Sequence, residues 1–142
     1  KTMAAETEAE QRPRRLRHTA LRVRDLEASI DFYSRLLGMK VTRRRDSVQH
    51  NHLAAYVAYG DEADHHALEL VQDKEPPAEF ILGNLYWHIN FSVPDLLELC
   101  VKLKSEGFAF SQPPTPMSMD DRYRIAFVRD PDGYEVELTD CP

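Results

Sequence analysis

The sequence predicts an α+β fold built from two βαβββ modules, at about residues 16–78 and 84–140. Three observations support this prediction: an internal repeat, a helical pattern directly after the first strand of each repeat, and short strands after each helix. The repeat is marked by His18 and His88, which match at an offset of 70 positions (88 − 18). Each module is therefore expected to carry the same elements in the same order.

The first module begins with a strand at residues 16–23, in which His18 and Arg22 share one face. A helix follows, because Asp25 is a natural N-cap and Gly38 supplies a left-handed end. The apolar positions at helical spacing are Leu26, Ile30, Tyr33 and Leu37. Three further strands are predicted at residues 40–45, 53–59 and 67–72.

The second module repeats this order from a strand at residues 85–93. Alternation puts His88 on a polar face and an apolar set on the face that meets a helix. The apolar set is Leu85, Trp87, Ile89, Phe91 and Val93. Asp95 with Glu98 forms a capping-box pattern, and Gly107 ends the helix. Further strands are predicted at residues 109–111, 124–129 and 134–139. The Pro-rich segment between the first two of these, residues 112–121, is the longest irregular piece and a candidate mobile lid.

Length and composition fit a soluble globular protein. The 142 residues suit a single domain, which we expect at residues 16–142 after a flexible N-terminal tail at residues 1–15. A formal charge of −6 argues against nucleic-acid binding, and no apolar run reaches the roughly 18 residues of a membrane span. Two cysteines and an acidic N-terminus without an apolar signal core favour a cytoplasmic location.

Two histidines and two glutamates occupy equivalent places in the repeat. Glu69 lies between two leucines in its strand, as Glu137 lies between Val136 and Leu138 in the closing strand. A lone strand glutamate is most often a solvated residue, and a lone strand histidine a satisfied half-buried one. Two imidazoles and two carboxylates together can hold a divalent cation and leave positions for water or substrate. The paired occurrence predicts a metal site.

The chain resembles the glyoxalase I (lactoylglutathione lyase) family of the vicinal-oxygen-chelate superfamily over about residues 16–140. The most specific segments of the resemblance are residues 18–23, 31–39, 68–70, 88 and 126–138. The resemblance implies a curved mixed sheet with helices on its outer face and a metal site in the concave cavity. The family metal ligands carry over to His18, Glu69, His88 and Glu137. It also implies one divalent metal per site, nickel or zinc with cobalt as a further candidate, and a homodimer with sites at the interface.

The family chemistry is the isomerisation of a hemithioacetal, formed by methylglyoxal and a thiol, to an S-lactoyl thioester. This lyase reaction detoxifies methylglyoxal by proton transfer through a metal-bound enediolate. We expect Glu137 to be the catalytic base, with Glu69 as its partner for the opposite stereoisomer.

Thiol recognition departs from the family pattern. Arg22 matches the family arginine that grips the glutamyl carboxylate of glutathione, but Asp73 stands where Asn is expected and Asn84 where some members have Arg. An acidic Asp73 would repel that carboxylate, so the thiol carries an amine, as in a glutathione–polyamine conjugate, or the substrate is not a glutathione adduct. Met119 and Arg122 are further substrate-binding candidates.

Two alternatives stay open from the sequence. One is another metalloenzyme of the superfamily, such as an epimerase acting on a carbon acid. The other is a protein that binds metal or a small molecule without turnover.

Overall fold

Both predicted modules are present in the computed structural model, which describes residues 12–142. The first contains β1 (His18–Arg22), α2 (Leu26–Asp31), the π-helical turn η1 (Phe32–Leu36), β2 (Lys40–Ser47), β3 (His52–Ala58) and β4 (Ala67–Asp73). The second contains β5 (His88–Ser92), α3 (Leu96–Ser105), β6 (Phe110–Pro116), β7 (Arg124–Arg129) and β8 (Glu135–Thr139). Most of the predicted N-terminal tail, residues 1–11, lies outside the described residues.

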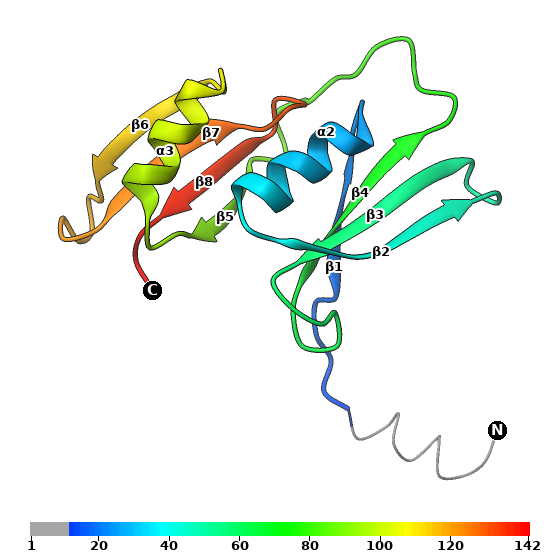
Figure 1. Ribbon diagram of the computed structural model, residues 1–142, viewed down its shortest axis with the longest axis horizontal. Coiled ribbons are helices and arrows are strands. Elements are labelled where there is room, and N and C mark those ends of the chain that lie inside the picture. Colours follow the sequence, from blue (N-terminus) through cyan, green and yellow to red (C-terminus); the bar gives the residue numbers. More distant parts are fainter. Residues whose placement is uncertain (1–11) are drawn as a thin grey trace.

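Each module folds into its own four-stranded mixed sheet. The strand orders are β1-β4-β3-β2 and β5-β8-β7-β6. In both sheets the first strand of the module pairs in parallel with the last, and the other neighbours are antiparallel. Figure 1 shows the two sheets side by side, with α2 where they meet and α3 over the second sheet. The predicted α+β repeat is confirmed.

The two helices begin differently. The Asp25 carboxylate accepts a hydrogen bond from the Ala28 amide at 3.1 Å, which confirms the predicted N-cap. Asp95 makes no such bond, so the capping-box prediction is wrong. Its backbone has φ −99° and ψ 38°, not the extended conformation from which an N-cap side chain reaches the next turn. Both helices end before glycines at positive φ, Gly38 at 80° and Gly107 at 89°, as predicted.

Two strands of the second module differ from the prediction. β6 extends to Pro116 and pairs with β7, so residues 112–116 are not part of a lid. An edge strand tolerates prolines because one side of it needs no amide donors. β5 is short because its partner β8 begins at Glu135, opposite His88. Leu85 is therefore 98% exposed and does not join the apolar face.

One apolar core joins the two modules. Residues from α2, η1, α3 and both sheets belong to the same buried cluster. Tyr33 stacks on Phe91 at 6.2 Å between ring centroids, and Phe32 meets Phe108 edge-on at 5.0 Å. Because these contacts cross from one module to the other, they fix the relative position of the two sheets.

The turn between β7 and β8 also fastens the modules together. Asp132 accepts hydrogen bonds from the Arg24 amide at 2.8 Å and from the Ser29 hydroxyl at 3.3 Å. The Tyr33 hydroxyl donates to Asp130 at 2.7 Å. Asp130 is almost fully buried, and burial raises its pKa to about 6 although its own donors, the Tyr33 hydroxyl and the backbone amides of Asp132 and Tyr134, favour the ionised carboxylate.

Candidate metal centre

In the first module, His18 and Glu69 lie on one sheet face, on the paired strands β1 and β4. The Nε2 atom of His18 is 3.1 Å from Oε2 of Glu69. The residues on either side of Glu69 in the chain, Leu68 and Leu70, point the other way into the shared core. The alternation of side chains along β4 therefore places the Glu69 carboxylate beside the His18 imidazole, while the two neighbouring leucines hold the strand against the core.

Tyr56, on β3, contacts both members of this pair. Its hydroxyl donates to Oε1 of Glu69 at 2.7 Å, and its ring meets the His18 ring edge-on at 5.4 Å. Burial raises the pKa of Tyr56, which keeps the hydroxyl protonated and able to donate. The Arg43 guanidinium lies over the tyrosine ring, 3.6 Å from its centroid, and Arg43 Nε is itself 3.0 Å from Glu62 Oε2.

The second module repeats the pair. His88 Nε2 lies 2.5 Å from Glu137 Oε2, on the paired strands β5 and β8. Phe127, on β7, meets the His88 ring edge-on at 5.2 Å. Trp87 stacks on Phe127 with an angle of 3° between the ring planes. Trp87 is thus on the histidine side of the sheet, and its predicted place in the apolar face is wrong.

The four predicted ligands form two separate pairs in one chain. Among residues 12–142, no group of three or more His, Cys, Asp or Glu side chains is close enough to hold a metal ion. One chain therefore presents two half-sites, one on each sheet. A complete four-ligand site requires the two kinds of half-site to meet, which one copy of this chain does not achieve on its own.

Both half-sites offer ligand atoms that suit a divalent cation, and the spacing of the first also fits. Ligand bonds of about 2.0 to 2.2 Å place adjacent nitrogen and oxygen ligands about 3 Å apart, close to the separation of His18 and Glu69. The Nδ1 atoms of His18 and His88 are buried, and no described residue pairs with them. An unpaired buried nitrogen is costly, so the hydrogen bonding of both imidazoles is incomplete in one chain. Imidazole and carboxylate are ligands suited to zinc, nickel and cobalt.

The predicted substrate-binding residues are scattered. Arg22 Nε is 2.7 Å from Asp73 Oδ2, so the two residues that bear on thiol recognition are paired with each other. Met119 is 94% exposed, and Arg122 pairs with Asp120 at 2.6 Å. The structure therefore brings Arg22 and Asp73 together but gives Met119 and Arg122 no contact with the predicted ligands.

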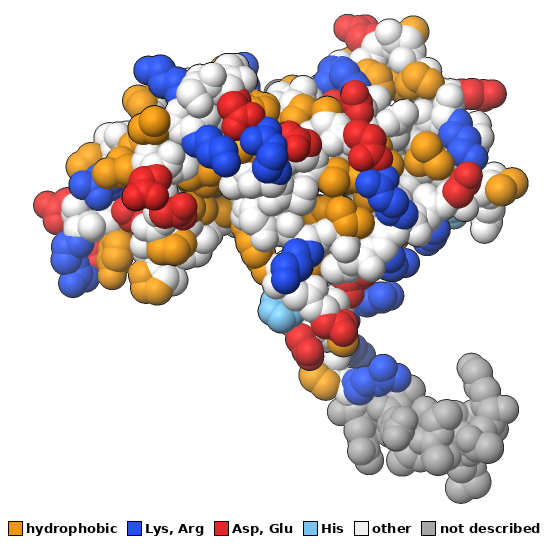
Figure 2. Space-filling model, in the orientation of Figure 1, with side chains coloured by type: hydrophobic (Ala, Val, Ile, Leu, Met, Phe, Trp, Pro, Cys, Tyr) orange, Lys and Arg blue, Asp and Glu red, His pale blue; other side chains and the backbone are white. Residues whose placement is uncertain are grey.

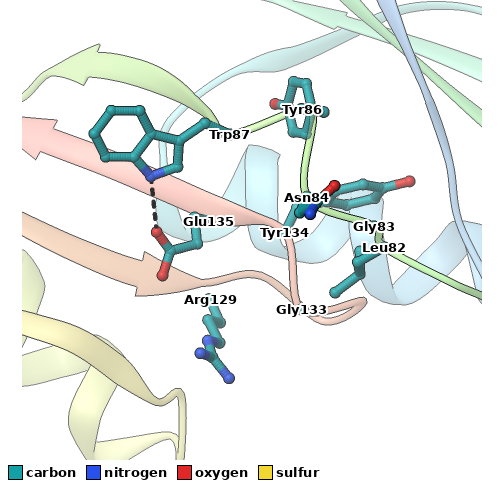
Figure 3. Close-up of a pocket in the computed structure, with 9 residues that line it drawn as sticks. All are labelled: Leu82, Gly83, Asn84, Tyr86, Trp87, Arg129, Gly133, Tyr134 and Glu135. Atoms are coloured by element: carbon teal, nitrogen blue, oxygen red, sulfur yellow. Dashed lines mark hydrogen bonds between the residues drawn. The ribbon is translucent and has the colours of Figure 1, made fainter.

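Asn84 lines a pocket of about 350 Å³ beside the second half-site. Figure 3 shows this pocket between the segment that leads into β5 and the strands β7 and β8, with the Trp87 indole donating to Glu135. The bond between Trp87 Nε1 and Glu135 Oε2 is 3.2 Å long. Trp87 also stacks on Phe127, whose ring meets the His88 ring edge-on. The pocket therefore lies next to the His88 and Glu137 pair.

Sequence reasoning missed Tyr56, Phe127 and Trp87. The register gives the signal that could have found two of them: Tyr56 pairs with Glu69 across the sheet, and Phe127 pairs with Glu137. Cross-strand partners project to the same face, so each aromatic ring had to lie beside a predicted ligand.

The surface carries charges of both signs. On the face shown in Figure 2, Lys and Arg side chains alternate with Asp and Glu rather than forming one basic area. In the described part of the chain, no helix has the length and apolar character needed to cross a membrane.

Known proteins similar to this chain in sequence or structure include a lactoylglutathione lyase and glyoxalase I enzymes. Residues 15–138 match the Glyoxalase/Bleomycin resistance protein/Dioxygenase superfamily. A lactoylglutathione lyase of Neisseria meningitidis is 44% identical over 124 residues, covering 87% of this chain and 88% of that protein. The solved trypanothione-dependent glyoxalase I of Leishmania major is 33% identical, with a TM-score of 0.76 over 89% of this chain and 86% of that chain. Glyoxalase I of Zea mays is 31% identical, with a TM-score of 0.80 over 89% of this chain and 44% of the maize chain.

Proposed function

The chain belongs to the Glyoxalase/Bleomycin resistance protein/Dioxygenase superfamily, and we infer that it is an isomerase of the glyoxalase I (lactoylglutathione lyase) type. It converts the hemithioacetal of methylglyoxal and a glutathione-type thiol to the S-lactoyl thioester. The observation that carries this inference is the repeated His and Glu pair, His18 with Glu69 and His88 with Glu137, in a chain 44% identical to a lactoylglutathione lyase.

The reaction moves one proton between neighbouring carbons. The C–H bond of the sulfur-bearing carbon breaks and a C–H bond forms on the adjacent carbon, while the hydroxyl and the carbonyl exchange places. We assign the proton transfer to Glu137, which takes the proton from the first carbon and returns it to the second. Glu69, predicted from the sequence as its partner for the opposite stereoisomer, belongs to the other His and Glu pair. Both carboxylates lie beside an imidazole, which orients them.

His18, Glu69, His88 and Glu137 would hold one divalent metal, with nickel or zinc as the first candidates and cobalt as a further one. When bound, the metal acts as a Lewis acid that polarises the two adjacent substrate oxygens and so acidifies the neighbouring C–H. Each pair supplies one neutral and one anionic ligand, which leaves coordination positions for the substrate.

We propose that the active protein is a homodimer. Each site would combine the His18 and Glu69 pair of one copy with the His88 and Glu137 pair of the other. The proposal is supported by the two separate half-sites among the described residues of one chain. We also propose a cytoplasmic location, in keeping with the sparse cysteines, of which Cys100 is buried as a free thiol.

The ion pair between Arg22 and Asp73 supports a second candidate for the thiol. A carboxylate that already neutralises Arg22 weakens its grip on the glutamyl carboxylate of glutathione and offers an acceptor to an amine. We therefore propose that the enzyme also accepts, or prefers, a polyamine-conjugated glutathione. The trypanothione-dependent relative from Leishmania major is 33% identical to this chain.

The test is a thioester-formation assay on the full chain loaded with nickel, zinc or cobalt. Methylglyoxal is offered with glutathione and, separately, with a polyamine-conjugated glutathione. We expect product with at least one thiol, loss of activity on chelation, and recovery when metal is returned. Absence of product with both thiols would overturn the proposal in favour of an epimerase or a binding protein.

A further inference from the structure

We propose that Tyr56 is a positioning residue that fixes Glu69 as a static ligand, and that its counterpart Phe127 leaves Glu137 free to move as the proton carrier. This inference rests on the proposed function and deepens it. It assigns different roles to two glutamates that the repeat makes equivalent, and it attributes the difference to one hydroxyl group.

Tyr56 and Phe127 occupy the same place in the two sheets. Each lies on the strand next to the glutamate-bearing strand and pairs with the glutamate across it. Each ring also meets the histidine of its module edge-on: Tyr56 to His18 at 5.4 Å and 85°, Phe127 to His88 at 5.2 Å and 79°. The aromatic support of the two half-sites is therefore nearly identical, and the hydroxyl is the chemical difference.

The hydroxyl completes the environment of Glu69. Oε1 accepts from Tyr56 at 2.7 Å while Oε2 lies 3.1 Å from His18, so both oxygens are occupied. Tyr56 is only 2% exposed, and the Arg43 guanidinium covers its ring. Because the donor is itself held in place, rotation of Glu69 away from its position would break a buried hydrogen bond.

Glu137 lacks this restraint. One oxygen faces His88, and among the described residues no hydrogen-bond donor reaches the other. A phenyl ring offers no donor, and Phe127 is held between Trp87 and His88. Glu137 can therefore swing towards a substrate carbon by breaking only its contact with His88, whereas Glu69 would also have to break the hydrogen bond from Tyr56.

The arrangement predicts opposite effects from removing the hydroxyl in one module and adding it in the other. Tyr56→Phe deletes the restraint on Glu69, and Phe127→Tyr adds an equivalent restraint to Glu137. Tyr59→Phe is a matched control, since Tyr59 follows β3 and its hydroxyl donates to the Leu37 carbonyl at 2.6 Å rather than to either glutamate.

The first readout is zinc affinity of the full chain, measured by competition with a chromophoric chelator. We expect Tyr56→Phe to weaken zinc binding by about tenfold or more, as loss of a hydrogen bond to a metal ligand does, and Tyr59→Phe to leave it unchanged. Unchanged zinc affinity in a folded Tyr56→Phe protein would overturn the inference.

The second readout is turnover by the zinc-loaded Phe127→Tyr protein. We expect kcat to fall by about tenfold or more with KM and zinc affinity maintained, because the added hydroxyl holds the proton carrier. Wild-type kcat in this variant would also overturn the inference, and this arm decides the matter if Tyr56→Phe does not fold. A wild-type chain that binds no zinc, nickel or cobalt would instead count against the proposed function itself.

Discussion

The two modules present the same His and Glu pair on equivalent strands, but they surround the pair differently. In the first module the carboxylate is held by a tyrosine hydroxyl, and Arg43 and Glu62 support the tyrosine. In the second, a phenylalanine and a tryptophan pack beside the histidine and give the carboxylate no donor. A repeat can thus preserve a His and Glu pair while a residue on the neighbouring strand decides whether the glutamate accepts a further hydrogen bond.

The connection that follows the third strand makes different contacts in the two modules. The loop after β3 in the first module carries Glu62, which pairs with Arg43 of the same sheet. The turn after β7 in the second module reaches across to the first, where Asp130 and Asp132 bind the α2 region. The loop after β3 stabilises the half-site of its own module. The turn after β7 fixes the position of the two modules relative to each other.

The largest effect should come from neutralising the two glutamates in turn. We expect Glu137→Gln to lower kcat by a factor on the order of a thousand while the protein still binds metal, because the proton carrier is lost. Glu69→Gln should lower metal content as well as kcat, since a fixed ligand is lost.

Turnover assays with elemental analysis of each purified variant check this difference. The exposed Glu98→Gln on α3 is the control and should match wild type. Full activity in Glu137→Gln, with loss confined to Glu69→Gln, would reverse the assignment of the two glutamates.

Asp130, in the turn between β7 and β8, should make the free energy of unfolding depend on pH. The pKa of Asp130 is raised from 3.8 to about 6 by burial, so the folded protein holds this proton more tightly than the unfolded chain. The stabilisation is fully present below about pH 4 and is lost as the pH rises to about 6, because the folded state must then bury a charge. Relative to Asp130→Asn, the wild type should lose about 3 kcal/mol of unfolding free energy over this range.

Chemical denaturation at pH 4 and pH 7 measures this change. Asp64→Asn, at an exposed position of the first module, should follow the wild-type profile. Parallel profiles for wild type and Asp130→Asn would show that the turn contributes no such pH dependence.

A smaller effect should appear at the ion pair of the first module. Asp73→Asn frees Arg22 for a substrate carboxylate, so KM for the glutathione adduct should fall by about tenfold. KM for a polyamine-conjugated thiol should rise, since the acceptor for its amine is lost. Steady-state assays with both thiols test this, and Asp46→Asn, which removes the neighbouring pair with Lys74, is the control. Equal changes for both thiols would remove Asp73 from thiol selection.

Repeat position and strand alternation were enough to predict the two modules and to single out His18, Glu69, His88 and Glu137. The pairing of each histidine with the glutamate of its own module follows from the parallel strands that carry them. Sequence patterns assign a side chain to a face, but they do not give the register between neighbouring strands. The Tyr56 hydroxyl bond depends on this register and was missed. Pro-rich β6 was predicted as a loop because sequence patterns do not reveal that a strand lies at a sheet edge, where prolines are tolerated.

The proposed convergence of the four predicted ligands also lies beyond strand patterns, because in the proposed dimer it depends on how a second copy docks. The described residues of one chain hold two half-sites and no complete one. Only the resemblance to a family suggested that two copies share each site.

Complementation between inactive variants tests this central claim most directly. His18→Ala disables the first half-site and Glu137→Gln the second, so each variant alone should be inactive. In a mixed dimer with shared sites, one site would combine both defects and the other would be wild type. Random reassortment of subunits should then restore about one quarter of wild-type activity, while mixing His18→Ala with Glu69→Gln, both in the first half-site, should restore none. Absence of restoration in the first mixture, with dimer exchange demonstrated, would contradict a site shared between two copies.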